Sequence, residues 1–113
     1  MTSKMKVQTS EGGTHTDVDE RELERLVEGL GSGTEFLIVE VDGRDEAYAQ
    51  ATTTPPQLKR QEAFTVEFRD GPHQHWQGFT NDRSEVQAVL AGWATGAADW
   101  KDRIEWTKLD LGF

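Results

Sequence analysis

Two stretches of the chain repeat apolar residues with the spacing of an amphipathic helix. The first stripe falls at positions i, i+3, i+4 and i+7 and consists of Leu23, Leu26, Val27 and Leu30. Asp17 is the expected N-cap of this helix, because Glu20 follows three residues later, as in a capping box. Gly29, Gly31 and Gly33 then predict its end, since glycine readily adopts left-handed backbone angles.

The second helical stretch covers about residues 83–95. Its stripe has the same spacing and consists of Val86, Val89, Leu90 and Trp93. Asp82 and Glu85 form another capping-box pattern, and Gly96 marks the end of the helix. Both stripes need an apolar surface to cover, so they predict two helices packed on a sheet.

The remaining pattern indicates β-strands. Residues 36–39 are apolar at every position, which is typical of a central strand covered on both faces. A short strand is expected over residues 4–8, and the prolines at 55–56 exclude a central strand there. The Asp-Gly pair at 42–43 predicts a two-residue hairpin loop with a return strand over residues 44–52. That register places two pairs of residues opposite each other: Ile38 with Ala47, and Phe36 with Ala49.

A second hairpin is predicted from residues 64–68 and 75–79, with two possible registers. A three-residue loop places Trp76 opposite Val66, whereas a four-residue loop places Phe79 opposite Phe64 and His75 opposite Phe68. In either register Trp76 and Phe79 point to opposite faces, because three positions separate them along one strand. One aromatic side chain therefore belongs to the core. The other is either exposed to a partner or covered by the C-terminal segment, residues 100–111.

That last segment, residues 100–111, alternates apolar and polar residues twice with a change of phase. The change predicts a final strand that carries a bulge or bend. The chain is long enough for one domain with a core of its own. We therefore expect a single α+β domain over residues 1–113. It consists of an antiparallel sheet of five or six strands with two helices packed on it, in the order β-α-β-β-β-β-α-β.

The net charge of −9 lies entirely within residues 11–46, which hold twelve acids and three bases. Direct nucleic-acid binding is not expected, because neutralising phosphates requires a basic surface. No apolar run reaches membrane-spanning length and no signal-peptide pattern is present, so we expect a cytoplasmic protein without membrane contact. The acidic stretch either keeps the protein soluble or attracts a basic protein partner, whose association complementary charge would speed.

No residue pattern predicts catalysis or a cofactor. The chain has no cysteine, and the glycine-rich segment 29–33 follows a helix and lacks the lysine of a phosphate-binding loop. His73 and His75 lie two residues apart, a spacing compatible with zinc, and Glu67 is a possible third ligand on the opposing strand. Nothing else converges on them. We expect no bound metal, no cofactor and no enzymatic activity.

The C-terminal half resembles a group of known proteins. Residues 64–71, His75, Trp76, 86–96 and 100–106 resemble small uncharacterised actinobacterial α+β proteins. Those proteins are similar to the immunity proteins that neutralise polymorphic toxins. The resemblance covers about half of the chain and is structural. It implies a protein partner, often a basic nuclease, held by an acidic surface, and it transfers no binding residue.

From these patterns we expect a non-enzymatic, acidic protein-interaction module, immunity-like in binding and inhibiting a basic partner protein. One alternative is a homo-oligomeric structural protein, such as a homodimer, that uses an aromatic face. Another is a small-ligand-binding domain. The residues expected to contact a partner are Glu24, Glu28, Asp42, Asp45, Glu46 and Trp76.

Overall fold

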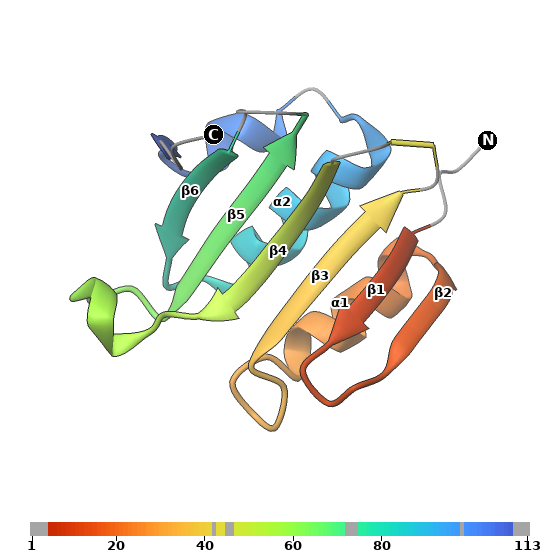
Figure 1. The fold of residues 1–113 in the computed structure, drawn as a ribbon, viewed down its shortest axis with the longest axis horizontal. Coiled ribbons are helices and arrows are strands. Elements are labelled where there is room, and N and C mark those ends of the chain that lie inside the picture. Colours follow the sequence, from red (N-terminus) through yellow and green to blue (C-terminus); the bar gives the residue numbers. More distant parts are fainter. Residues whose placement is uncertain (1–4, 42, 45–46, 72–74, 98, 110–113) are drawn as a thin grey trace.

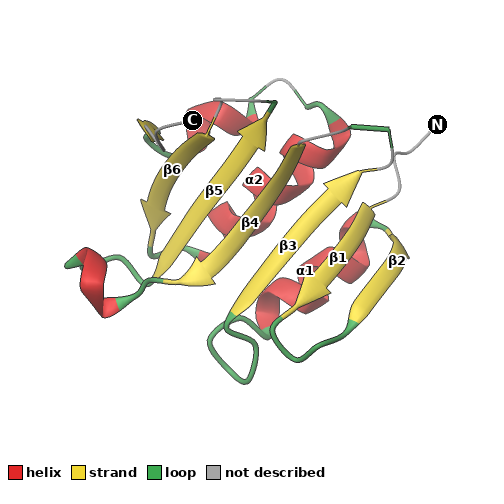
Figure 2. Cartoon of the chain, in the orientation of Figure 1, coloured by secondary structure: helices red, strands yellow, loops and turns green. Residues whose placement is uncertain are grey.

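The computed structural model describes residues 5–41, 43–44, 47–71, 75–97 and 99–109. Its strands are β1 (Met5–Thr9), β2 (Thr14–Val18), β3 (Phe36–Val41), β4 (Ala47–Thr53), β5 (Phe64–Asp70), β6 (His75–Thr80) and β7 (Thr107–Leu109). Its helices are α1 (Glu20–Glu28) and α2 (Arg83–Thr95), with short 3-10 helices η1 (Pro56–Leu58) and η2 (Trp100–Arg103). Both long helices lie on the same face of the sheet (Figures 1 and 2).

The sheet is antiparallel, in the order β2-β1-β3-β4-β5-β6-β7. This confirms the α+β class and the two helices, but the sheet has seven strands rather than five or six. The additional strand is β2, which pairs with β1 at one edge. Most of its residues are exposed and it contains one buried apolar side chain, Val18, so it lacks the alternation by which a strand is recognised.

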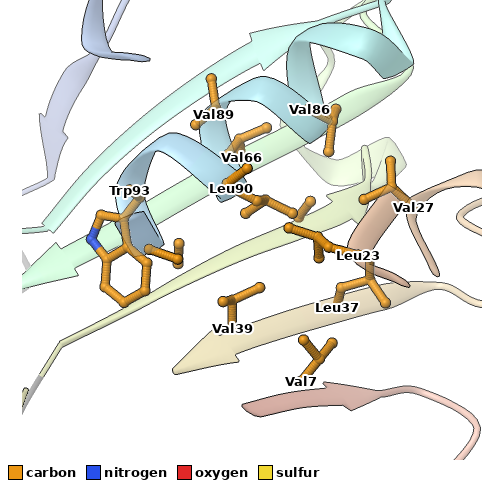
Figure 3. Close-up of a cluster of buried hydrophobic side chains, with 14 of the residues drawn as sticks. Val7, Leu23, Val27, Leu37, Val39, Val66, Val86, Val89, Leu90 and Trp93 are labelled. Carbon is orange, nitrogen blue, oxygen red and sulfur yellow. The ribbon is translucent and has the colours of Figure 1, made fainter. Parts of the chain in front are cut away.

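The core lies between the sheet and the two helices. Figure 3 shows Leu23 and Val27 of α1 facing Leu37 and Val39 of β3, while Leu90 of α2 packs near Val66. Every one of these side chains is at most 1% exposed. Both predicted helical stripes are therefore confirmed as core. Only Leu26 among their members is partly exposed.

Helix α1 begins two residues later than the sequence predicts. Asp17 is not its N-cap: it lies in β2 with φ of 54°. Asp19 caps the helix instead, and its Oδ1 accepts a hydrogen bond of 2.8 Å from the backbone N of Glu22. For α2 the predicted bounds are confirmed. Asp82 is the N-cap, and Gly96 ends the helix with φ of 77°.

Arg83 joins the two helices. Its Nη1 donates to the backbone oxygens of Val27 at 2.7 Å and Leu30 at 2.6 Å, at the C-terminal end of α1. Its guanidinium also lies over the ring of Phe64, 4.9 Å from the centroid. A cation at this position satisfies carbonyls that have no partner within the helix and complements the helix dipole. The first residue of α2 thus fixes the end of α1.

The predicted register of the β3–β4 hairpin is wrong. Val39 pairs with Ala49, and five residues rather than two separate the strands. The observed pairing of β4 with β3 is displaced by three positions from the predicted one. Because three is an odd number, each residue of β3 shares its face with the residues of β4 that were predicted to lie on the other face. Ile38 pairs with Gln50, and Phe36 pairs with Thr52, on the face away from the helices. The strand is central as expected, but none of the described helices covers its second face (Figure 1), and Phe36 is 38% exposed.

Both predicted registers of the β5–β6 hairpin are also wrong. Phe68 pairs with Trp76 and Val66 with Gly78. The predicted register with a three-residue loop differs from the observed pairing by two positions. An even displacement keeps the faces, so this register puts Trp76 on the helix-covered face, where the structure has it. The predicted register with a four-residue loop differs by one position, which exchanges the faces and puts Phe79 on the wrong one. The two aromatic side chains do point to opposite faces, as parity requires.

The C-terminal segment covers Trp76 from the helix side. Instead of one long strand it forms η2 and the short strand β7. Trp100 is 8% exposed, and both Trp100 and Trp106 stand edge-on to Phe68, with ring centroids 4.8 Å away. Trp76 stacks on the same ring at 6.3 Å. Trp76 is therefore the aromatic on the core side of the sheet, where it is partly buried, and Phe79 is the one that points away from the core.

Candidate functional site

The exposed side of α1 carries a row of carboxylates. Glu20, Glu24 and Glu28 are exposed and four residues apart, so they follow one side of the helix. Asp17 and Asp19 extend the row beyond its first turn, and both are exposed. We call these five residues the acidic α1 surface. Over residues 17–28 six carboxylates face two arginines, a local charge of −4.

The glutamates of this row are not neutralised within the described part of the chain. Arg25 and His15 both approach the Oε1 of Glu22, at 3.5 and 3.8 Å, and none of the described ion pairs involves Glu20, Glu24 or Glu28. Like charges four residues apart destabilise a helix by about 0.2–0.5 kcal/mol per pair. Glu28 also lies at the negative end of the helix dipole. Glu24 and Glu28 therefore lower the local stability of the helix, whereas the dipole favours Glu20 in the first turn.

The six residues expected to contact a partner differ in where they lie in the structure. Glu24 and Glu28 are exposed on α1, as predicted. Asp42, Asp45 and Glu46 lie outside the described residues. Trp76 is partly buried against the core on the helix side of the sheet, and its ring stacks on that of Phe68.

The face of the sheet opposite the helices forms a second surface, which we call the open face. No described helix covers it (Figure 1). It consists of the side chains that alternate with the core positions of β3 to β6: Phe36, Ile38, Glu40, Tyr48, Gln50, Thr52, Thr65, Glu67, Arg69, His75, Gln77 and Phe79. Sequence reasoning missed most of them, although the alternation within each strand was a signal.

A hydrogen-bonded row of polar side chains crosses the middle of the open face. The Nε2 of Gln50 donates to Glu67 Oε2, and the Nε2 of Gln77 donates to Glu67 Oε1 at 3.2 Å. The three residues come from β4, β5 and β6 and pair in register across the sheet. Both carboxylate oxygens of Glu67 therefore have partners, which holds its charge in a fixed position.

Beside this row, Tyr48, Arg69 and His75 lie in register on the same strands. The rings of Tyr48 and His75 meet edge-on, 6.1 Å apart. Burial and the charge of Glu67 raise the pKa of the Tyr48 hydroxyl, with Arg69 acting in the opposite direction. Burial and the charge of Arg69 lower the pKa of the His75 imidazole against the effect of Glu67. The fold therefore favours the neutral form of both groups.

The lowered pKa of His75 predicts a pH dependence of stability. The unfolded chain takes up the proton near its ordinary pKa of 6.5, before the folded chain does. Folding stability from this group is therefore complete above pH 6.5 and is lost as the pH falls below it. We expect the free energy of unfolding in urea to fall from about pH 7 to pH 5 and to fall less steeply in His75→Gln. Parallel curves for the two proteins would contradict this.

Phe79 is the aromatic of β6 that points away from the helices, and the loop before β5 partly covers it. The guanidinium of Arg60 lies 4.2 Å from the centroid of its ring. A depression of about 370 Å³ adjoins this contact and is lined mainly by charged and polar side chains, among them Arg60, Glu62 and Arg103. These charges are already paired, Arg60 with Glu62 and Arg103 with Glu85. The depression lacks the apolar lining that is typical of small-molecule sites.

Within the described ranges, no group of three or more histidine, aspartate or glutamate side chains is placed to hold a metal ion. His73 of the zinc-like pattern lies outside those ranges. None of the described helices is long and apolar enough to span a bilayer. Comparison of the chain with protein-family models, with curated proteins and with solved structures finds no match.

Proposed function

We propose that this protein is a non-catalytic, cytoplasmic binding module that uses its acidic α1 surface to hold a basic protein partner. The observation that carries the proposal is the row of exposed glutamates at positions 20, 24 and 28, which the described part of the chain leaves unneutralised. Lysine or arginine side chains of a partner would relieve the repulsion within this row. The partner would thus gain electrostatic energy that the isolated helix lacks.

The position of α1 fits this role. The helix packs its apolar stripe inward while its acidic side faces solvent, so the carboxylates are presented on a rigid element. Arg83 and the Asp19 cap fix both ends of that element. A fixed array of like charges creates a field that speeds the approach of an oppositely charged protein.

The inhibitory, immunity-like role is the finer part of the proposal. It rests on the resemblance of the C-terminal half to immunity proteins, whereas the acidic surface lies in the N-terminal half. An inhibitor of a basic nuclease has to compete with nucleic acid, and an acidic surface competes by offering negative charge to the same cations. Such an inhibitor needs no catalytic group of its own.

The test begins with proteins from the source cells that bind the immobilised chain at low salt. The partner is then purified, and its association and dissociation rates are measured against two double variants. Glu24→Lys with Glu28→Lys reverses the charge of the row. Asp102→Lys with Glu105→Lys makes the same charge change at exposed positions near the opposite edge of the sheet.

We expect the first double variant to slow association by roughly tenfold or more and to change dissociation far less. The second double variant should change association only slightly, because neither Asp102 nor Glu105 belongs to the acidic α1 surface. An acidic partner, or equal effects of the two double variants on the association rate, would contradict the proposal.

A further inference from the structure

The open face differs from the rest of the molecule in its charge. The chain carries a net charge of −9, yet the charged strand residues of β1 and of β3 to β6 on this face are balanced. They are Lys6, Glu40, Glu67 and Arg69, two of each sign. A second copy of this chain would be repelled by the acidic α1 surface, and it meets no net charge at the open face. The electrostatic repulsion between two copies is therefore smallest when they approach each other through their open faces.

The open face also has the composition of a protein contact. Phe36 is 38% exposed, and Ile38, Tyr48 and Phe79 are each partly exposed on three different strands. Aromatic and aliphatic groups of this kind supply the apolar area of interfaces. The carboxylate of Glu67 is already satisfied by Gln50 and Gln77. Covering the middle of the face therefore does not leave the carboxylate of Glu67 buried without hydrogen-bond partners.

The sheet register arranges charges of alternating sign in one row. Lys6 of β1 pairs with Glu40 of β3, and Tyr48 of β4 pairs with Arg69 of β5. Because Val39 pairs with Ala49, Glu40 lies beside Tyr48, and the row reads Lys6, Glu40, Tyr48, Arg69 across four strands. The central strand β4 thus has a negative charge on one side and a positive charge on the other.

We propose that the open face is a dimer interface between two copies of this chain, related by a two-fold axis that runs along β4. Such an axis lays β3 of one copy over β5 of the other and keeps the position along the strand. Glu40 of each copy then faces Arg69 of the other copy, twice per dimer. Sheets that pack face to face keep their strands nearly aligned, as this arrangement requires, and two-fold dimers are the commonest assemblies.

The test uses charge reversal in single variants and in their mixture. Glu40→Arg alone sets arginine against arginine, and Arg69→Glu alone sets glutamate against glutamate. An equimolar mixture of the two variants restores both opposite-charge pairs in a heterodimer. Sedimentation equilibrium measures the mass of each sample, and circular dichroism checks that each variant is folded. Asp102→Arg is the control, at an exposed position of η2 on the helix side of the sheet.

We expect the wild-type chain and Asp102→Arg to be dimers. Each open-face variant should dimerise at least about tenfold more weakly, and the mixture should recover the dimer. A wild-type chain that stays monomeric up to about 100 µM would overturn the proposal. The open face would then be a candidate contact surface for a different protein. Single variants that dimerise like wild type, or a mixture that stays monomeric, would also overturn the proposal.

Discussion

Replacing Leu90 with alanine is expected to lower the free energy of unfolding by about 2–5 kcal/mol. Leu90 has no exposed surface and lies in the core between α2 and the sheet, near Val66 of β5 (Figure 3). Truncation removes buried apolar area and leaves a cavity between elements that are fixed by their own hydrogen bonds. Unfolding in urea, followed by tryptophan fluorescence, measures the loss.

Leu58→Ala is the matched control for this substitution. Leu58 lies in η1 and is 41% exposed, so the same truncation removes little buried area. We expect a change below about 0.5 kcal/mol, as is usual for surface positions. A loss smaller than this at Leu90, or equal losses at the two sites, would contradict the assignment of α2 to the core.

Gly92→Ala is the second substitution with a large expected effect, a loss of about 2 kcal/mol. A Cβ at this position of α2 would lie 2.4 Å from Cβ of Trp100 and 2.9 Å from its Cγ. Because the Cβ of Trp100 is attached to its backbone, η2 itself would have to move. Alanine favours a helix over glycine by up to about 1 kcal/mol, which is smaller than the cost of such overpacking.

Gly29→Ala is the control for this prediction. Gly29 has a φ of −77°, which alanine adopts, and a Cβ there would meet its nearest atoms at 3.4 and 3.5 Å. We expect this variant to match wild type within about 1 kcal/mol. Equal stability of Gly92→Ala and Gly29→Ala would show that η2 does not pack against α2 as described.

The helices could be predicted from the sequence because their signals are local. For α2 the cap, the apolar stripe and the terminal glycine agree, so its bounds are confirmed. For α1 the sequence contains two capping patterns, because Asp17 precedes Glu20 by three residues and Asp19 precedes Glu22 by three residues. The prediction used the first pattern, and the structure uses the second. The sequence does not show that Asp17 belongs to an edge strand, because β2 is mostly exposed.

The strand registers could not be predicted, because they depend on where each strand ends and not on a local motif. The Asp-Gly pair at 42–43 is a strong hairpin signal, yet five residues separate β3 from β4. This error placed Phe36 opposite Ala49 and Ile38 opposite Ala47, whereas the structure pairs them with Thr52 and Gln50 on the open face. An error of one position is enough to exchange the two faces of a strand.

Because strand registers could not be predicted, the sequence indicates only one of the two candidate surfaces. The charge of α1 can be predicted, since Glu24 and Glu28 belong to one helix. The open face cannot, because Gln50, Glu67 and Gln77 come from three strands and meet only through their pairing. The acidic α1 surface and the open face lie on opposite sides of the sheet, so a dimer formed through the open face would present two acidic surfaces outward.

The most direct test of the central claim, that the acidic α1 surface attracts a basic protein, is the salt dependence of partner association. The association rate of the purified partner with the wild-type chain is measured from about 20 to 300 mM salt, over which the Debye length falls to below 10 Å. We predict that the association rate falls by roughly tenfold or more while the dissociation rate changes by less than about threefold. An association rate that is constant over this range would contradict the account.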